Sequence, residues 1–210
     1  MASTGTLELK DRHNHIVIFT VFLAATLYLP VTLIWMGIIP FRYRFAVMFC
    51  VLTVIVSYVW IRKFNWSDLG FRRDTLKKSM MWNFGTSLLF LSLLYWLHDE
   101  GLIGKETINF WPLFFIFYIL ILTPAQEFFF RSILFAEMGN LHKKRYWSII
   151  ILSSLSFCFL HIIYQHPVMM LVTFFMGLIW SIIYYKYPNF WGVTLSHAML
   201  GTAAFALGVI

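Results

Sequence analysis

Charged residues are scarce in this sequence. Only 12% of its 210 residues are Asp, Glu, Lys or Arg, whereas soluble domains carry about a quarter. This shortage excludes a soluble enzyme and a disordered chain, because both need a polar surface in contact with water. Cysteine is also rare, since only Cys50 and Cys158 occur and both lie in apolar runs, which excludes a disulfide scaffold. No Cys–His cluster has metal-site spacing, and HExxH is absent.

Apolar residues are abundant instead. They make up 60% of the chain, and the mean hydropathy is +0.77. A membrane-spanning helix needs about 20 residues, so this supply predicts six or seven helices. The sequence therefore predicts an all-α polytopic membrane helix bundle, folded as a single integral membrane domain over 1–210. Seven spans are expected, at 16–39, 43–62, 79–98, 109–137, 146–164, 167–186 and 190–209.

Two segments depart from plain apolar runs. The fourth run is too long for one straight crossing and contains Pro124, which predicts a kink or break near 120–124. The segment 65–79 mixes four basic residues with Trp66 and Phe71. That mixture predicts an interfacial, partly amphipathic stretch that lies on the membrane.

The distribution of positive charge predicts an orientation. With a cytoplasmic N-terminus and alternating spans, 12 of the 16 Lys and Arg residues fall inside, and only Arg42, Arg44 and Lys105 fall outside. This is the positive-inside pattern, with Arg42 and Arg44 on the disfavoured side. The net charge of +7 therefore indicates topology and anionic lipid rather than a nucleic-acid partner.

Four ionisable residues lie within the spans and are candidates for function, because burying them in hydrocarbon is costly. They are Glu127, Arg131, His161 and His197, and Gln126 is a polar neighbour. In a helix, Glu127 and Arg131 share one face at i and i+4 and can pair. The competing interpretation is structural, with a pair that pins helices together and histidines that hydrogen-bond between them.

Brought together, these groups would form the equipment of a hydrolase. A carboxylate, two imidazoles and a guanidinium can activate water and stabilise a tetrahedral oxyanion. Ser196 lies beside His197, but no Asp completes a catalytic triad. Two histidines and a glutamate can also ligate a metal in principle, although no metal or cofactor is predicted.

Two of three ordered motifs lie in the fourth and fifth spans and resemble those of a known family. The first reads P-x-Q-E-x-x-F-R-S-x-L from Pro124, where the family has EExxxR. The second is Phe157-Cys-Phe-Leu-His161, the family's FxxxH. They resemble the CAAX protease and bacteriocin-processing family (CPBP, also called Abi) of glutamic-type intramembrane proteases.

The third motif extends the resemblance to the end of the chain. It consists of Gly177 in one helix, a turn at 187–189, and then His197 where the family has HxxxN. The motif-bearing core is therefore about 109–210. Several relatives are bacterial, so the resemblance implies a bacterial cytoplasmic (inner) membrane protein, and its N-terminus is predicted to be cytoplasmic.

The resemblance implies an endopeptidase that cleaves a membrane-associated peptide or protein in the lipid bilayer. The cut would lie near a C-terminal sorting or lipid-modified segment. In this family the first glutamate activates water and the FxxxH histidine assists it. The last histidine and the residue four later hold the oxyanion, while the second glutamate and the arginine hold the geometry. No metal is needed, and the oligomeric state is undetermined.

The chain departs from the family at Gln126, where the first glutamate is expected. A carboxamide cannot serve as a general base. Three explanations are compatible with this: an engineered inactive variant, a natural inactive homologue that only binds, or a divergent member that uses Glu127 as the base. Ser132 replaces a glycine, and Gly201 replaces the last asparagine, which leaves Thr202 as an alternative oxyanion donor.

The sequence thus predicts a CPBP-type endopeptidase, with Glu127 as base, His161 assisting and His197 on the oxyanion. The alternative is an inactive homologue that acts as a membrane binding or immunity protein. A transporter is less favoured, because no inverted repeat is evident. The predicted spans conflict with a shared site in one respect. Counted from the helix ends at the rise per residue of an α-helix, His161 and His197 lie about 10 Å apart in membrane depth.

Overall fold

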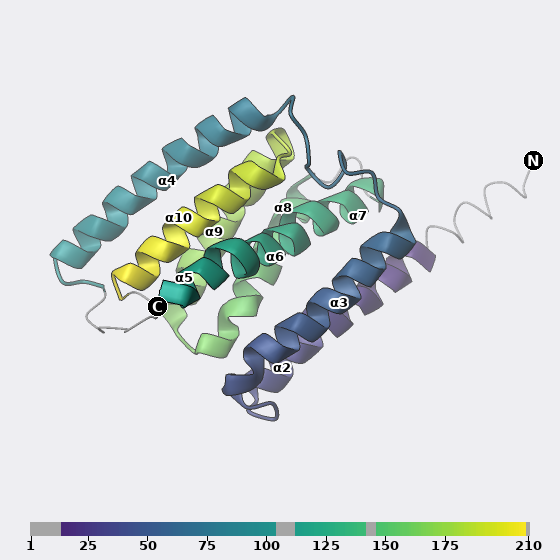
Figure 1. Ribbon diagram of the computed structural model, residues 1–210, viewed down its shortest axis with the longest axis horizontal. Coiled ribbons are helices and arrows are strands. Elements are labelled where there is room, and N and C mark those ends of the chain that lie inside the picture. Colours follow the sequence, from purple (N-terminus) through teal and green to yellow (C-terminus); the bar gives the residue numbers. More distant parts are fainter. Residues whose placement is uncertain (1–13, 104–111, 142–145, 209–210) are drawn as a thin grey trace, which may run out of the picture.

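The computed structural model describes residues 14–103, 112–141 and 146–208, and every regular element within these ranges is a helix (Figure 1). Six of the helices are long and apolar enough to cross a membrane. The six candidate spans are Asn14–Trp35, Phe41–Arg62, Leu76–Asp99, Pro112–Gly139, Tyr146–Tyr164 and Pro167–Lys186. The seventh expected span, 190–209, corresponds to the 17-residue helix α10 (Phe190–Ala206), which is shorter than these six.

The shorter elements subdivide these spans. The first span ends with the π-helical segment η1 and α2, a 3₁₀ turn η2 precedes α3, and another, η5, follows α8. The bounds are η1 Ala24–Tyr28, α2 Leu29–Trp35, η2 Phe41–Tyr43, α3 Arg44–Arg62, α4 Leu76–Asp99, α8 Tyr146–Leu160, η5 His161–Tyr164 and α9 Pro167–Lys186.

The fourth span is a continuous helix from Pro112 to Gly139, so of the predicted kink or break near 120–124 the break does not occur. Its irregularity takes another form, because π-helical segments lie on both sides of α6. The bounds are α5 Pro112–Phe117, η3 Tyr118–Leu122, α6 Thr123–Glu127, η4 Phe128–Ile133 and α7 Leu134–Leu141. Pro124 cannot donate a backbone hydrogen bond, and the wider π spacing immediately before it accommodates that loss without ending the helix.

The helices pack around an aromatic core. In Figure 1, α4 and α10 run alongside each other at one side of the bundle, and α2 and α3 lie at the opposite side. The fourth span, α8 and α9 fill the space between them, where Phe130 and Phe157 are almost wholly buried. Large apolar side chains such as Trp60 cover the outer faces, as expected for helices in lipid. The chain is an integral membrane protein.

The segment before α4 positions the start of α10. The Gly70 carbonyl accepts a hydrogen bond from the Phe190 amide (2.9 Å), and Thr75 Oγ1 donates to the Pro188 carbonyl (2.6 Å). Asn189 donates from Nδ2 to the Arg72 carbonyl (2.7 Å). Residues 65–75 therefore form turns docked against the α9–α10 connection. Their place at the membrane surface stays a prediction.

Candidate active site

Glu127 is the centre of a buried charged group formed by two helices. Its side chain has no solvent exposure, and its Oε1 accepts from Arg131 Nη1 (3.1 Å) and lies 2.7 Å from His197 Nδ1. The predicted i,i+4 pairing with Arg131 is confirmed. The other oxygen, Oε2, has no hydrogen-bond partner among the described residues. One carboxylate oxygen thus ties α6 to α10.

Arg131 is held by a third helix. Its Nη2 donates to the Gly177 carbonyl on α9 (3.3 Å), and its guanidinium carbon lies 4.6 Å from the centre of the Phe157 ring. A Cβ at Gly177 would lie 3.3 Å from both the Phe157 ring and the Ser154 backbone. Glycine therefore permits the close approach of α9 to α8 at the level of the arginine.

His161 begins the 3₁₀ turn η5, where α8 ends. Its Nδ1 lies 2.8 Å from the Phe157 carbonyl oxygen. A carbonyl can only accept a hydrogen bond, so this contact assigns the proton of the neutral ring to Nδ1 and leaves a lone pair on Nε2. Only 8% of the residue is exposed, in a wall shared with the cavity described next.

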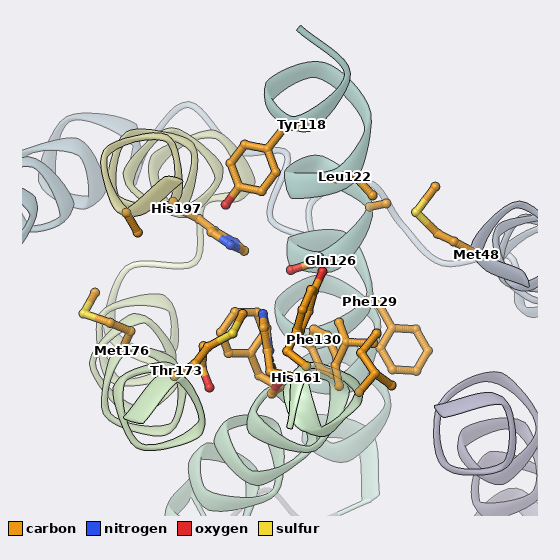
Figure 2. Close-up of a pocket in the computed structure, with 18 of the residues that line it drawn as sticks. Met48, Tyr118, Leu122, Gln126, Phe129, Phe130, His161, Thr173, Met176 and His197 are labelled. Carbon is orange, nitrogen blue, oxygen red and sulfur yellow. Dashed lines mark hydrogen bonds between the residues drawn. The ribbon is translucent and has the colours of Figure 1, made fainter. Parts of the chain in front are cut away.

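Gln126, His161 and His197 line one cavity of about 380 Å³ with mostly apolar walls. Figure 2 shows the three side chains directed toward this common space. Glu127 and Arg131 are absent from the described lining, although Glu127 contacts the lining residue His197. The Oε1 of Gln126 is buried and has no hydrogen-bond partner among the described residues. The residue that faces the cavity is therefore the glutamine, and its acidic neighbour faces the protein interior.

The two histidines lie close together, although the predicted spans place them at different depths in the membrane. The Phe157 ring centre lies 4.8 Å from that of His161 and 5.3 Å from that of His197. Rise along a helix equals depth in the membrane only when the helix is upright, and inclined helices whose side chains reach toward one another bring the two imidazoles together. The structure therefore brings the FxxxH and final histidines to the same site.

Tyr118 is a site residue that the sequence interpretation missed. It is 6% exposed and lines the cavity, and a Cβ added to Gly201 would overlap its hydroxyl. The tyrosine thus occupies the space of a side chain at position 201. Thr202 is not among the lining residues. The sequence contains a pattern that could have indicated this residue. Tyr118 lies on the same helix face as Gln126, because Tyr118, Leu122 and Gln126 are spaced four residues apart.

Trp180 was also missed and supports His197. Its ring lies 4.7 Å from the imidazole, centre to centre, at an interplanar angle of 29°. Its Nε1 donates to Ser196 Oγ (2.9 Å), which also contacts the Ser87 hydroxyl on α4 (2.7 Å). Stacking on one side and the Glu127 contact on another leave the imidazole little freedom to rotate.

A second buried carboxylate lies at the far end of the same helix. Glu137 is 1% exposed and accepts from Arg62 Nε (2.7 Å) and Nη2 (3.1 Å) and from the Tyr58 hydroxyl (2.6 Å). It joins the fourth span to α3 and does not line the cavity. Within the described ranges, no three His, Cys, Asp or Glu side chains gather as a possible metal site.

Comparison with protein families finds a match in the second half of the chain. The Rce1-like family, described as type II CAAX prenyl endopeptidase Rce1-like, matches residues 108–203. These 96 of the 210 residues are similar to that family, so the likeness covers just under half of the chain. The match agrees with the CPBP resemblance and supports a CAAX-protease-like hydrolase in general terms. No curated protein and no solved structure matches the chain.

The Rce1-like region contains all five residues that the sequence singled out, together with Tyr118 and Gly201. Residues from outside it complete the cavity wall, among them Arg44, Phe45 and Met48 near the start of α3. The cavity is therefore built jointly by the Rce1-like region and the helices that precede it.

Proposed function

We propose that this protein is an intramembrane endopeptidase that hydrolyses a peptide bond of a membrane-associated substrate in the cavity. The observation that carries the proposal is the convergence of Gln126, His161 and His197 on one mostly apolar space inside an Rce1-like region. Apolar walls favour a substrate segment that adjoins lipid-embedded or lipid-modified residues. The cytoplasmic N-terminus and bacterial membrane stay predictions.

We assign the general base to His161 rather than Glu127. The lone pair on His161 Nε2 follows from the Nδ1 contact with the Phe157 carbonyl, and the residue lines the cavity. Glu127 is fully buried outside the described lining, and its Oε1 already has two partners. Gln126 cannot take a proton, but its carboxamide can hold the attacking water by hydrogen bonds.

His197 and Tyr118 are the proposed donors to the oxyanion. The Glu127 carboxylate can only accept, so it holds a proton on His197 Nδ1. The proposed step takes the imidazole with a second proton on Nε2. The opposite nitrogen, Nε2–H, would then donate to the developing negative charge. The Tyr118 hydroxyl adds a second donor in place of a side chain at Gly201. Arg131 positions Glu127 and does not itself touch substrate.

The proposed reaction balances as an ordinary hydrolysis. The water oxygen bonds to the scissile carbonyl carbon while His161 Nε2 takes one of its protons. The carbon–nitrogen bond then breaks, and that proton passes from His161 to the departing amine. The products are a new carboxylic acid, which keeps the second proton of the water, and a new amine, and the imidazole returns to its neutral state.

Cleavage by the purified protein in lipid nanodiscs tests this assignment. The substrates are quenched fluorescent peptides with and without a prenylated cysteine. His161→Ala should lower kcat/KM by about 100-fold or more, because it removes the base. The matched control is His166→Ala: His166 is exposed, lies outside the lining and only accepts from the Met169 amide (3.1 Å) to cap α9. It should change kcat/KM by less than about threefold, because a cap contributes only about 1 kcal/mol to helix stability.

Gln126→Glu completes the test. In an active enzyme with His161 as base, this change should keep or raise the rate. Cleavage that survives His161→Ala would overturn the assigned base. Cleavage that appears only after Gln126→Glu would overturn the proposed activity of this chain and identify it as an inactive binding form.

A further inference from the structure

Ser196 precedes His197 on α10, yet the proposed hydrolysis does not use its hydroxyl. The residue is 2% exposed and is not among the described lining residues of the cavity, so it does not meet the substrate. Ser87 on α4 is fully buried and also lies outside that lining. The two hydroxyl oxygens are 2.7 Å apart. This serine pair therefore joins α4 to α10 immediately beside the histidine.

The hydrogen bonds around Ser196 have a defined direction. The Trp180 indole nitrogen can only donate, so Ser196 Oγ accepts its proton (2.9 Å). The Ser196 hydroxyl proton then needs another acceptor, because buried hydroxyls are seldom left unpaired. The Ser87 oxygen at 2.7 Å is closer to it than the Asn83 carbonyl oxygen at 3.5 Å. The donors consequently run from Trp180 through Ser196 to Ser87.

The indole at the start of this series is the surface on which His197 stacks. The ring centres are 4.7 Å apart, and the planes are inclined by 29°. A buried indole N–H is costly without an acceptor, so the position of Ser196 Oγ fixes how the indole is turned. Glu127 holds the imidazole only at Nδ1, and a single hydrogen bond leaves a ring able to pivot. The orientation of the indole therefore limits the tilt of the imidazole.

Close packing of α4 against α10 brings Ser87 within reach of Ser196. A Cβ added to Gly192 would overlap Ser79 Oγ, so glycine permits the two helices to approach near their starts. Helix α4 lies outside residues 108–203, the region that is similar to the Rce1-like family. The support for His197 thus includes a residue that this region does not contain.

We infer that Ser87 is a positioning residue for His197 and acts on it through Ser196 and Trp180. The inference rests on the proposed function, because it takes His197 Nε2 as a donor to the oxyanion. The placement of the ring, however, is measurable without any cleavage. Helix α4 then helps to orient the site and does not merely separate α10 from lipid.

Nuclear magnetic resonance of the His197 ring tests its placement directly. The protein is labelled with ¹³C- and ¹⁵N-histidine in nanodiscs, and His197 is assigned by the signal that His197→Gln removes. Protons stacked on an indole resonate upfield because of its ring current. Ser87→Ala should move the His197 ring C–H signals downfield, because Ser196 would turn to the Asn83 carbonyl and the indole would follow. Ser196→Ala removes the acceptor itself and should shift them at least as far.

Ser181→Ala is the matched control. Ser181 and Ser153 are also fully buried, and their hydroxyl oxygens, 3.1 Å apart, join α9 to α8 outside the described lining. This variant should lower thermal stability about as much as Ser87→Ala, because each removes one hydroxyl from a buried pair between helices. It should leave the His197 signals in place. An equal shift in both variants would overturn the inference by showing general loosening of the bundle, as would unmoved signals in Ser87→Ala.

A double-mutant cycle tests the route through the indole. Ser87→Ala should lower kcat about fivefold while KM changes by less than about twofold, because ring placement matters most in the transition state. Trp180→Phe keeps an aromatic ring beside the imidazole but has no N–H. In that background, Ser87→Ala should lower kcat no further, since the two residues act in one series. A full fivefold loss in both backgrounds would overturn the proposed route.

The two proposals fail in different ways. Cleavage by the unmodified chain, together with His197 signals that do not respond to Ser87→Ala, would refute the positioning role and support the hydrolase. Displaced signals in Ser87→Ala without any cleavage by the unmodified chain would refute the hydrolase and support the placement of His197 by Ser87.

Discussion

Glu127 and Glu137 lie on one continuous helix, and each is buried beside an arginine. Their surroundings nevertheless differ. Both oxygens of Glu137 are occupied, by two nitrogens of Arg62 and the Tyr58 hydroxyl, and the residue lies away from the cavity. Glu127 uses only Oε1, and one of its two partners, His197, lines the cavity. A buried ion pair is therefore not in itself a sign of function; its connection to the cavity is what distinguishes Glu127.

The largest expected effect comes from Glu127→Gln. A neutral amide would remove the carboxylate that holds the proton on His197 Nδ1 and orients the ring, so we expect kcat to fall about 100-fold or more. Arg131 would lose its buried partner, and unfolding should require about 3 kcal/mol less. Cleavage assays and thermal unfolding in detergent measure the two losses. A near-normal kcat would refute the claim that Glu127, unlike Glu137, contributes to catalysis.

Tyr118→Phe sharpens the comparison, because it changes the cavity without disturbing either ion pair. Loss of one oxyanion donor should lower kcat about tenfold or more. KM and thermal stability should change little, since no buried charge is uncovered. An unchanged kcat would show that the hydroxyl only fills the space beside Gly201.

The smallest effect on cleavage is expected from Glu137→Gln. It should destabilise the protein by about 2 kcal/mol, because Arg62 would lose a charged partner although it remains partly exposed. The kcat of the folded fraction should stay within about threefold of the starting value. Thermal unfolding and active-site-normalised rates measure this, and a kcat loss as large as that of Glu127→Gln would refute a purely structural role.

The features predicted from the sequence agree best with the structure where the membrane environment determines them. Hydropathy alone predicts an all-α bundle, and six of the seven expected spans correspond to helices long enough to cross. The ionisable residues inside the spans also indicate the candidate site, because such residues are costly in lipid. Pro124 shows the limit, since a π-helical segment accommodates it without a break.

The sequence by itself therefore determined the solvent, the helices and the candidate residues. Tertiary structure alone decided which of them meet the cavity. Gln126 and Glu127 are adjacent, but helix neighbours point about 100° apart, so one faces the cavity and the other the interior. Packing likewise decided that Tyr118 occupies the space beside Gly201 and that Arg44 joins the wall. These contacts join residues far apart in the chain, and local spacing contains no information about them.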